Sequence, residues 1–293
     1  MKHKTRIVFF IFILALFSGL LFSCAFMAQV AKEAGLIDEK SAQAIARAAE
    51  DITPEQEYYI GRAVAANILN NYNIYNGSPD LTAYLNQICK AIVINSPRPV
   101  IFNDYHVNIL DSQEINAFAT SGGHIFITLG LIACADSEEA LAGVIAHEIS
   151  HIQLKHGLKV IKNSRWGQAI VVTGASKIDD ATGMNLGELT EVFSESVGEI
   201  INTLVNSGFS PNQEYEADKE ALSLMAKTGY DPSGLISMLK VLERTQTDTA
   251  SGFGKTHPKP ADRISRAEKL IGQYKVQNTR SYRTERYRAT GTL

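Results

Sequence analysis

Cysteine is scarce in this sequence, because its 293 residues include only Cys24, Cys89 and Cys134. Three cysteines are too few for a scaffold held together by disulfides. Their spacing also excludes a cysteine zinc knuckle. The chain is therefore neither a disulfide-rich module nor a small zinc-knuckle domain.

A large excess of one charge is also absent. Lysine and arginine number 28 against 31 aspartates and glutamates, so the formal net charge is −3. This balance gives no general affinity for nucleic acid, and we predict no nucleic-acid partner. After residue 31 the sequence has no apolar run long enough to span a membrane. With 45% hydrophobic residues, the composition suits one globular domain of moderate size with appendages.

The amino terminus has the pattern of a targeting segment. A basic stretch, Met1–Arg6, precedes an uncharged apolar run, Ile7–Ser23. The run ends at Cys24 in a pattern similar to a bacterial lipobox, although Phe22 stands where a small residue is usual. We predict that the segment before Cys24 is a lipoprotein signal peptide and that Cys24 carries the lipid. The alternative is a retained transmembrane anchor, because the uncharged run continues to Ala31.

Either alternative holds the rest of the chain outside the cytoplasm, at a membrane. We divide the chain into a signal peptide (1–23), a tether with a leading helix (24–51), a globular domain (52–275) and a basic carboxyl-terminal tail (276–293). We expect the tail to be disordered, with contact to anionic lipid as the alternative. If Cys24 is acylated, Cys89 and Cys134 either form a disulfide or stay free.

The motif H-E-x-x-H occupies residues 147–151. Residues four apart share one face of an α-helix, so His147 and His151 can present two imidazoles to one metal ion. Glu148 lies close enough to reach a water molecule at that metal. The surrounding residues are apolar around most of the helix, which predicts a buried helix. We expect it to begin with Asp136 as N-cap and Glu139 at N3.

Caps and breakers divide the domain into helices and two strands. We expect helices at 54–70, 80–94 with Asp80 as cap, 210–229, 231–244 and 260–271, and strands at 105–110 and 125–129. This order predicts a mainly α fold with a small β-sheet (α+β) beside the motif helix. An exposed edge of that sheet would accept an extended peptide. The candidate substrate strand is Gly123, His124, Ile125 and Phe126.

Residues 166–206 have the pattern of a helical hairpin with a mobile connection. It is either a plain pair of core helices or a lid over the metal site. The sequence does not separate these alternatives.

A catalytic zinc site needs three protein ligands and one open position. The metzincin solution requires glycine three and histidine six residues after His151, where this chain has Leu154 and Gly157. His156 is five residues on and is expected to point elsewhere. The remaining solution, that of the gluzincins, takes a carboxylate from a second helix. Glu214 is the candidate ligand, and Asp218 one turn later is placed to accept a hydrogen bond from a ligand histidine.

Four motifs in this order resemble one peptidase family, which includes HtpX, the CAAX prenyl endopeptidases and the BepA- and LoiP-like proteases. They are NAFATSGGHIFITLGLI (116–132), HEISH (147–151), EYEAD (214–218) and THPKPADRI (256–264), and the resemblance covers about 52–272. Two departures are Ser121, where the family usually has proline, and Pro211, where it often has arginine. The absence of later apolar runs favours the soluble, LoiP-like lipoprotein branch.

The resemblance implies a gluzincin-type domain that binds one Zn²⁺ through His147, His151 and Glu214. It implies Glu148 as the catalytic base and Asp218 as an orienting residue or proton donor. In the BepA-like branch a histidine of the His-Pro motif can occupy the fourth zinc position. In this chain the corresponding residue is His257. It is either such a plug or a histidine at the start of a helix that packs in the core.

The expected function is hydrolysis of peptide bonds in misfolded or membrane-associated proteins of the bacterial envelope. The expected location is the periplasmic face of a membrane, the outer one in a Gram-negative organism, with the anchor at Cys24. One alternative is a zinc-bound chaperone or assembly factor for outer-membrane proteins that cuts rarely. A second is a zinc amidase that acts on cell-wall peptides. The sequence leaves the oligomeric state open.

Overall fold

The computed structural model describes residues 24–49, 51–163, 198, 200–245, 252–257, 260–275 and 280–290. The expected signal peptide at 1–23 lies outside the described residues, as does most of the hairpin expected at 166–206. The chain divides into two compact units. The first comprises Met1–Ile52 and Lys159–Ser196, and the second comprises Thr53–Leu158 and Val197–Leu293.

Within the first unit, residues 24–49 form two helices where the sequence suggested a tether and one helix. They are α2 (Cys24–Glu33) and α3 (Glu39–Ala49), which pack against each other. Ala28 and Ala42 are buried, and Lys32 forms an ion pair with Glu39. Among the residues that the structure describes, every helix is too short or too polar to cross a bilayer.

Three short strands form the sheet of the second unit. They are β1 (His106–Leu110), β2 (Ala117–Ala119) and β3 (His124–Thr128). β3 lies in the middle, parallel to β1 and antiparallel to β2. The turn between β2 and β3 contains Gly122 and Gly123 at φ 83° and 96°, a conformation that glycine adopts without steric cost. The sequence predicted β1 and β3 to within one residue at each end and missed β2.

The central position of β3 corrects the candidate substrate strand. Both edges of β3 are already hydrogen-bonded, one to β1 and the other to β2. An added peptide needs unpaired backbone groups along one edge of a strand. Gly123, His124, Ile125 and Phe126 form this central strand and the residue before it, so their assignment as a substrate strand was wrong.

The outer edge of β1 is occupied by other parts of the chain. The side-chain amide of Asn86 pairs with both backbone groups of Val107, at 2.8 Å to its oxygen and 2.9 Å from its nitrogen. Further along, the backbone N–H of Tyr75 donates to the oxygen of Ile109 at 2.8 Å. Within the described residues, the outer edge of β2 has no neighbouring strand.

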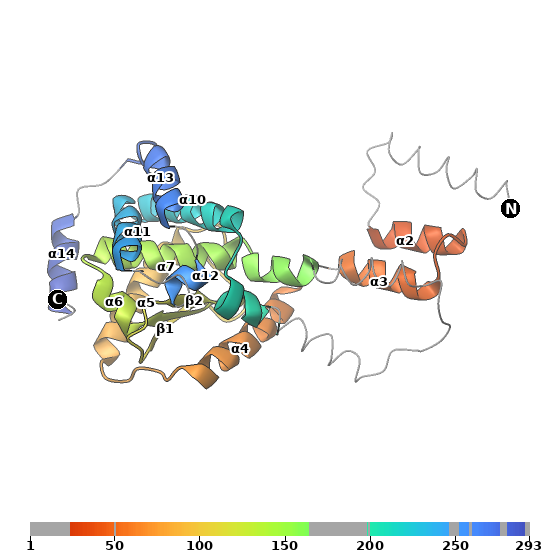
Figure 1. The fold of residues 1–293 in the computed structure, drawn as a ribbon, viewed down its shortest axis with the longest axis horizontal. Helices are drawn as coiled ribbons and strands as arrows, with labels where there is room; N and C mark the ends of the chain where they lie inside the picture. The colour runs from red at the N-terminus through yellow and green to blue at the C-terminus, as the bar shows by residue number, and fades with distance from the viewer. Residues whose placement is uncertain are drawn as a thin grey trace. The chain divides into compact units, whose positions relative to one another are not determined.

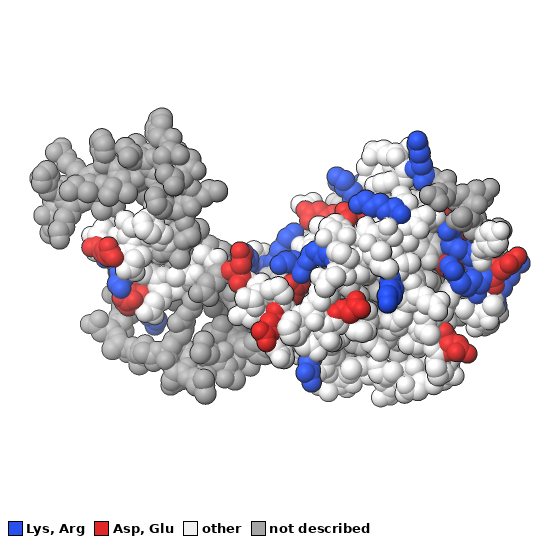
Figure 2. Space-filling model, turned by 180° about the vertical axis from the view of Figure 1, so that it is seen from behind, with Lys and Arg blue, Asp and Glu red and all other residues white. Residues whose placement is uncertain are grey.

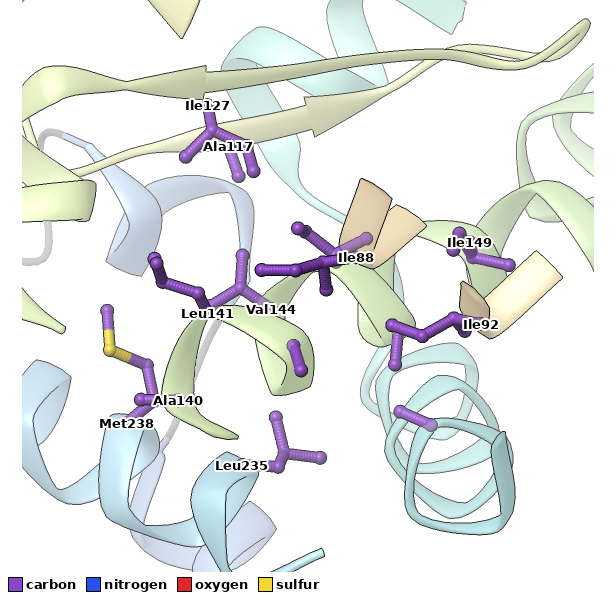
Figure 3. Packing of buried hydrophobic residues seen from close by; sticks show 14 of the residues in the cluster. Ile88, Ile92, Ala117, Ile127, Ala140, Leu141, Val144, Ile149, Leu235 and Met238 are labelled. Atoms are coloured by element: carbon purple, nitrogen blue, oxygen red, sulfur yellow. The ribbon is translucent and has the colours of Figure 1, made fainter. Parts of the chain in front are cut away.

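Helix α7 (Glu138–Gln153), which carries the H-E-x-x-H motif, is the central element of the core (Figure 1). Every residue from Glu138 to Ile152 is buried, as the apolar pattern predicted. α7 packs against α5 (Pro79–Ile94), α10 (Pro211–Thr228), α11 (Ser233–Thr245) and β2. Figure 3 shows the sheet residues Ala117 and Ile127 on one side of α7, with Leu235 and Met238 of α11 on the other.

Serine and threonine residues cap the helix starts. Thr53 forms a capping box with Gln56 at the start of α4 (Pro54–Asn71), the helix predicted at 54–70. The cap of α5 lies two positions before the expected Asp80, and that of α7 one position after the expected Asp136, because the hydroxyls of Ser78 and Ser137 accept the capping hydrogen bonds. The caps predicted from their neighbours, Asp80 and Asp136, were wrong. Shorter or later elements of the second unit include α6 (Leu129–Cys134), the π-helix η1 (Asn202–Ser207), α12 (Phe253–Thr256) and α13 (Pro260–Ile271).

The carboxyl-terminal segment is helical where a disordered tail was expected. Helix α14 (Arg280–Ala289) carries arginines that gather at one end of the domain, at the right of Figure 2. Nε of Arg283 lies 2.7 Å from Oε1 of Glu139, and Arg286 pairs with Glu138. The phenol of Tyr287 donates to the backbone of the α6–α7 connection at 2.7 Å. Two arginines of α14 thus form ion pairs with the two glutamates in the first turn of α7.

Both described cysteine side chains are free thiols. Cys89 is buried in α5, and Cys134 is half-buried at the end of α6. Of the two alternatives left open by the sequence, the structure has the unpaired one. Burial raises the pKa of the Cys89 thiol to about 12.

Candidate metal centre

The two histidines of α7 meet as their spacing predicted. Nε2 of His147 lies 3.1 Å from Nε2 of His151, one helical turn away. Both side chains are 1% exposed. Two facing imidazole nitrogens are satisfied either when one N–H donates to the other or, if both present lone pairs, when a cation between them accepts both. With the further donors described below, a metal ion fits the second case.

Glu214 reaches the same point from α10. A capping box of Ser210 and Gln213, with Pro211 at the first helical position, sets the start of this helix. Glu214 follows in the first turn, with its side chain fully buried. Its carboxylate oxygens lie 3.6 Å from Nε2 of His147 and 3.4 Å from Nε2 of His151.

His257 is the fourth donor at this point. Its Nδ1 lies 3.1 Å from each oxygen of Glu214 and 3.4 Å from Nε2 of His147. The ring stacks on Phe253 of α12, with centroids 4.2 Å apart. The donor atoms of His147, His151, Glu214 and His257 all lie within 4.8 Å of one another. Three imidazoles and one carboxylate in a buried tetrad fit a divalent ion of the Zn²⁺ type.

Asp218 and Arg263 form the support behind His147. Oδ1 of Asp218 lies 3.0 Å from Nδ1 of His147, one turn after Glu214 on α10, as predicted. Arg263 of α13 binds both oxygens of Asp218, and its Nη1 lies 3.0 Å from Oε2 of Glu214. Burial acts to raise the pKa of Asp218, but the guanidinium outweighs it and lowers the pKa to about 2. Sequence reasoning gave Arg263 no role, although it lies in the quoted THPKPADRI motif.

His156 also belongs to the site, which corrects the expectation that it points elsewhere. Its Nδ1 lies 2.9 Å from Nδ1 of His151, and its Nε2 lies 3.2 Å from Oε2 of Glu216. In a continuous helix a residue five positions on would lie about 140° away from His151. Here α7 ends at Gln153, and Lys155 takes a left-handed conformation with φ 56°. This break turns the chain so that His156 returns to the ring of His151.

Glu148 occupies the position expected of a catalytic base. It is 1% exposed, and its Oε1 has no hydrogen-bond partner among the described residues. Nε2 of His257 is 3.7 Å from that oxygen. Burial is the main cause that raises the pKa of Glu148 above its usual value. A buried carboxylate with one free oxygen is costly, and ionisable groups perturbed in this way cluster at functional sites.

The space in front of Glu148 is closed. β2, Glu148, Leu204, Phe209 and His257 enclose it, and it is too small for a water molecule. A peptide cannot reach Glu148 in this conformation. The open edge of β2 runs along this space, because Ala117, Phe118 and Ala119 line it.

Comparison with known proteins gives one family. Residues 79–271 match peptidase family M48. The chain is 24% identical over 249 residues to the Beta-barrel assembly-enhancing protease of Escherichia coli strain K12, covering 80% of this chain and 48% of that protein. It is 32% identical over 152 residues to Metalloprotease LoiP of the same organism, covering 52% and 57%.

A eukaryotic protein is similar as well. The chain is 27% identical over 206 residues to the Mitochondrial metalloendopeptidase OMA1 of Schizosaccharomyces pombe, covering 68% of this chain and 56% of that protein. The chain thus spans about half the length of these curated relatives.

Proposed function

The chain belongs to peptidase family M48, and on that premise we propose that it is a zinc-dependent endopeptidase of the gluzincin type. The observation that carries the proposal is Glu148, buried beside four converging donors with one carboxylate oxygen free of hydrogen bonds within the described residues. A hydrolytic site needs such a base next to its metal. A structural zinc site has no use for one.

His147, His151 and Glu214 are the residues that we assign to hold one Zn²⁺ per chain. When bound, the ion supplies Lewis-acid activation of a water molecule and of the scissile carbonyl. Glu148 removes a proton from the attacking water and delivers it to the leaving amine. Its raised pKa favours this role, because the carboxyl must hold the proton between the two steps.

Asp218 acts as a positioning residue in this proposal. Its lowered pKa, about 2, leaves it without a proton to donate near neutral pH. Its Oδ1 is 3.0 Å from Nδ1 of His147, so it fixes that ring with Nε2 facing the metal. The alternative role of Asp218 as proton donor is therefore disfavoured.

The substrate binds as an added strand on the outer edge of β2. In the antiparallel pair, Phe118 faces Phe126 of β3, with Ala117 and Ala119 on either side of it. Thr120 donates its N–H to the oxygen of His124, which fixes the alternation of inward and outward backbone groups. The outward groups therefore belong to Ala117 and Ala119. Their small side chains leave room for a peptide backbone beside Glu148.

His257 keeps the site latent in this proposal. Its Nδ1 takes the fourth donor position, and its ring contributes to closing the space beside β2. Substrate binding then requires His257 to leave the tetrad. After that movement His147, His151 and Glu214 remain as the three protein ligands that a catalytic zinc site requires.

The envelope of a bacterium is the proposed place of action. Two of the relatives are a Beta-barrel assembly-enhancing protease and a metalloprotease of Escherichia coli. By analogy we propose misfolded or membrane-associated envelope proteins as substrates. A lipid anchor at Cys24, the first residue of α2, would hold the domain at the membrane because acyl chains partition into the bilayer.

Cleavage of unfolded casein by the purified protein tests the proposal. We expect slow, chelator-sensitive cleavage by the wild-type chain. Glu148→Gln should abolish cleavage and keep one Zn²⁺ per chain, since the glutamine amide cannot take up a proton. Full activity of that variant would overturn the proposal. Zinc binding with suppression of casein aggregation, and no cleavage even after His257→Ala, would instead identify a chaperone.

A further inference from the structure

The two histidines of α7 that we assign as metal ligands are oriented by different hydrogen-bond partners. Nδ1 of His147 faces the buried carboxylate of Asp218 directly, at 3.0 Å. Nδ1 of His151 faces another imidazole, that of His156, at 2.9 Å. The second nitrogen of His156 faces Glu216 at 3.2 Å, and the side chain of Glu216 is 54% exposed.

We propose that His156 and Glu216 form a hydrogen-bonded relay that holds His151 in its metal-binding tautomer. The inference rests on the proposed function in one respect, that Nε2 of His151 binds the metal. His156 and Glu216 touch neither substrate nor metal and are positioning residues. The relay runs from the protein surface to the metal site.

The direction of each hydrogen bond follows from the metal-binding nitrogen. Nε2 of His151 must present a lone pair to the metal, so its proton is on Nδ1. That proton is donated to Nδ1 of His156, which must therefore be the bare nitrogen of a neutral ring. The proton of His156 is then on Nε2 and is donated to Oε2 of Glu216. One arrangement of protons satisfies all three residues.

The backbone is shaped to make this contact. His156 can return to His151 only because Lys155 adopts φ 56° after the end of α7. A residue with a β-carbon is strained in that conformation, so the turn has a cost that some contact must offset. The ring of Phe209 lies flat on His151, with centroids 4.2 Å apart and planes 19° apart. Phe209 fixes the plane of the ring, and His156 fixes its rotation within that plane.

Substitutions at His156 separate the relay from simple packing. Asparagine carries its amide oxygen at the same number of bonds from Cβ as Nδ1, so His156→Asn keeps an acceptor for His151. Glutamine carries its amide group where Nε2 lies, so His156→Gln keeps the link to Glu216 and loses the acceptor. His156→Ala loses both. His106→Ala, at an exposed histidine of β1, is the matched control.

The measurement is the Kd of Zn²⁺ for the full chain, by competition with a chromophoric chelator at fixed pH. We expect His156→Ala and His156→Gln to weaken binding about 10- to 100-fold, the usual effect of losing a partner behind a ligand. His156→Asn should bind close to wild type, and His106→Ala should match it. Glu216→Ala should weaken Zn²⁺ binding less than His156→Ala does, because water can replace Glu216 as the hydrogen-bond acceptor at this exposed site.

The thermal unfolding temperature of the metal-free variants separates affinity from folding. The relay predicts that asparagine rescues zinc affinity even if all three variants at His156 lower that temperature equally. Equal affinity of the alanine, glutamine and asparagine variants would overturn it. If wild type binds Zn²⁺ and His156→Ala binds it equally well, the relay fails while the proposed function stands. If the wild-type chain binds no Zn²⁺, both fail.

Discussion

Arg263 and Asp218 form a two-point ion pair inside the protein, with Nε 2.8 Å from Oδ2 and Nη2 2.7 Å from Oδ1. The guanidinium is 1% exposed, and its third nitrogen reaches Glu214 at 3.0 Å. One cation thus serves the carboxylate that orients His147 and a carboxylate of the donor tetrad. The arrangement pairs both carboxylates with a buried cation without any contribution from a metal.

Replacing Arg263 with methionine should destabilise the metal-free protein strongly. Removing one partner of a buried ion pair leaves an uncompensated charge and costs about 3–5 kcal/mol. Urea unfolding of the metal-free protein measures this loss. Lys240→Met is the matched control, because Lys240 pairs with Glu268 at 2.7 Å while both are about half exposed. That pair should contribute about 1 kcal/mol or less. Equal losses in the two variants would contradict a structural role for Arg263.

His257→Ala should raise the rate of casein cleavage. Its Nδ1 lies 3.1 Å from Glu214 in the closed site, and the remaining three ligands suffice to hold Zn²⁺. If the open form is less than a tenth of the population, the gain should be about tenfold or more. The double variant His257→Ala with Glu148→Gln must be inactive. A lower rate in His257→Ala with zinc still bound would assign His257 to catalysis instead.

Arg283→Met should lower the stability of the second unit more than Arg286→Met. Arg283 and Glu139 are both nearly buried, with side chains 10% and 4% exposed. The side chain of Arg286 is 51% exposed, and its buried partner Glu138 keeps hydrogen bonds from the hydroxyls of Tyr84 and Tyr230 when Arg286 is removed. We expect a loss of about 3 kcal/mol for the buried pair. Differential scanning calorimetry measures the change in Tm. Arg288→Met, at an exposed position of the same helix, should leave Tm unchanged. A disordered carboxyl terminus would instead give no change in any of the three variants.

Alkaline pH should destabilise the fold above about pH 9. Burial raises the pKa of Cys89 from 9.0 to about 12 and that of Tyr105 from 10.0 to about 12. The unfolded chain loses these protons first, so the stabilisation is complete below pH 9.0 and is lost as pH rises towards 12. Each group contributes a slope of at most about 1.4 kcal/mol per pH unit.

Urea unfolding over the range from about pH 8 to about pH 11 measures that slope. Cys89→Ala should flatten the curve just above pH 9.0, and Tyr105→Phe should flatten it above pH 10.0. A free energy of unfolding that stays constant over this range would contradict the burial of both groups.

Local signals predicted most of the helices and the meeting of the donors. Proline after serine or threonine marked the starts of α4 and α10, and the spacing of His147 and His151 within one helix fixed their approach. The mainly helical fold with a small sheet is confirmed. These features depend on residues a few positions apart, which periodicity captures.

The features that sequence reasoning missed depend on long-range contacts or on an irregular backbone. β2 is three residues long, which is too short for an alternation of apolar and polar residues to be recognised in the sequence. His156 reaches His151 only through the left-handed turn at Lys155, which helix geometry does not foresee. The helical α14 depends on Glu138 and Glu139, more than a hundred positions away along the chain. A basic composition alone therefore predicted disorder.

The sheet has one further consequence, for how the protein coexists with the unfolded chains that we propose it handles. Asn86 and Tyr75 cover the outer edge of β1, and β3 is enclosed between its neighbours. Within the described residues, the one open edge belongs to β2 and lies inside the closed site. Exposed strand edges are where proteins stick together and begin to form fibrils. In the part of the chain that the structure describes, the only sheet edge left to template a new strand leads to Glu148, so we expect the protein to resist joining the aggregates of unfolded polypeptides.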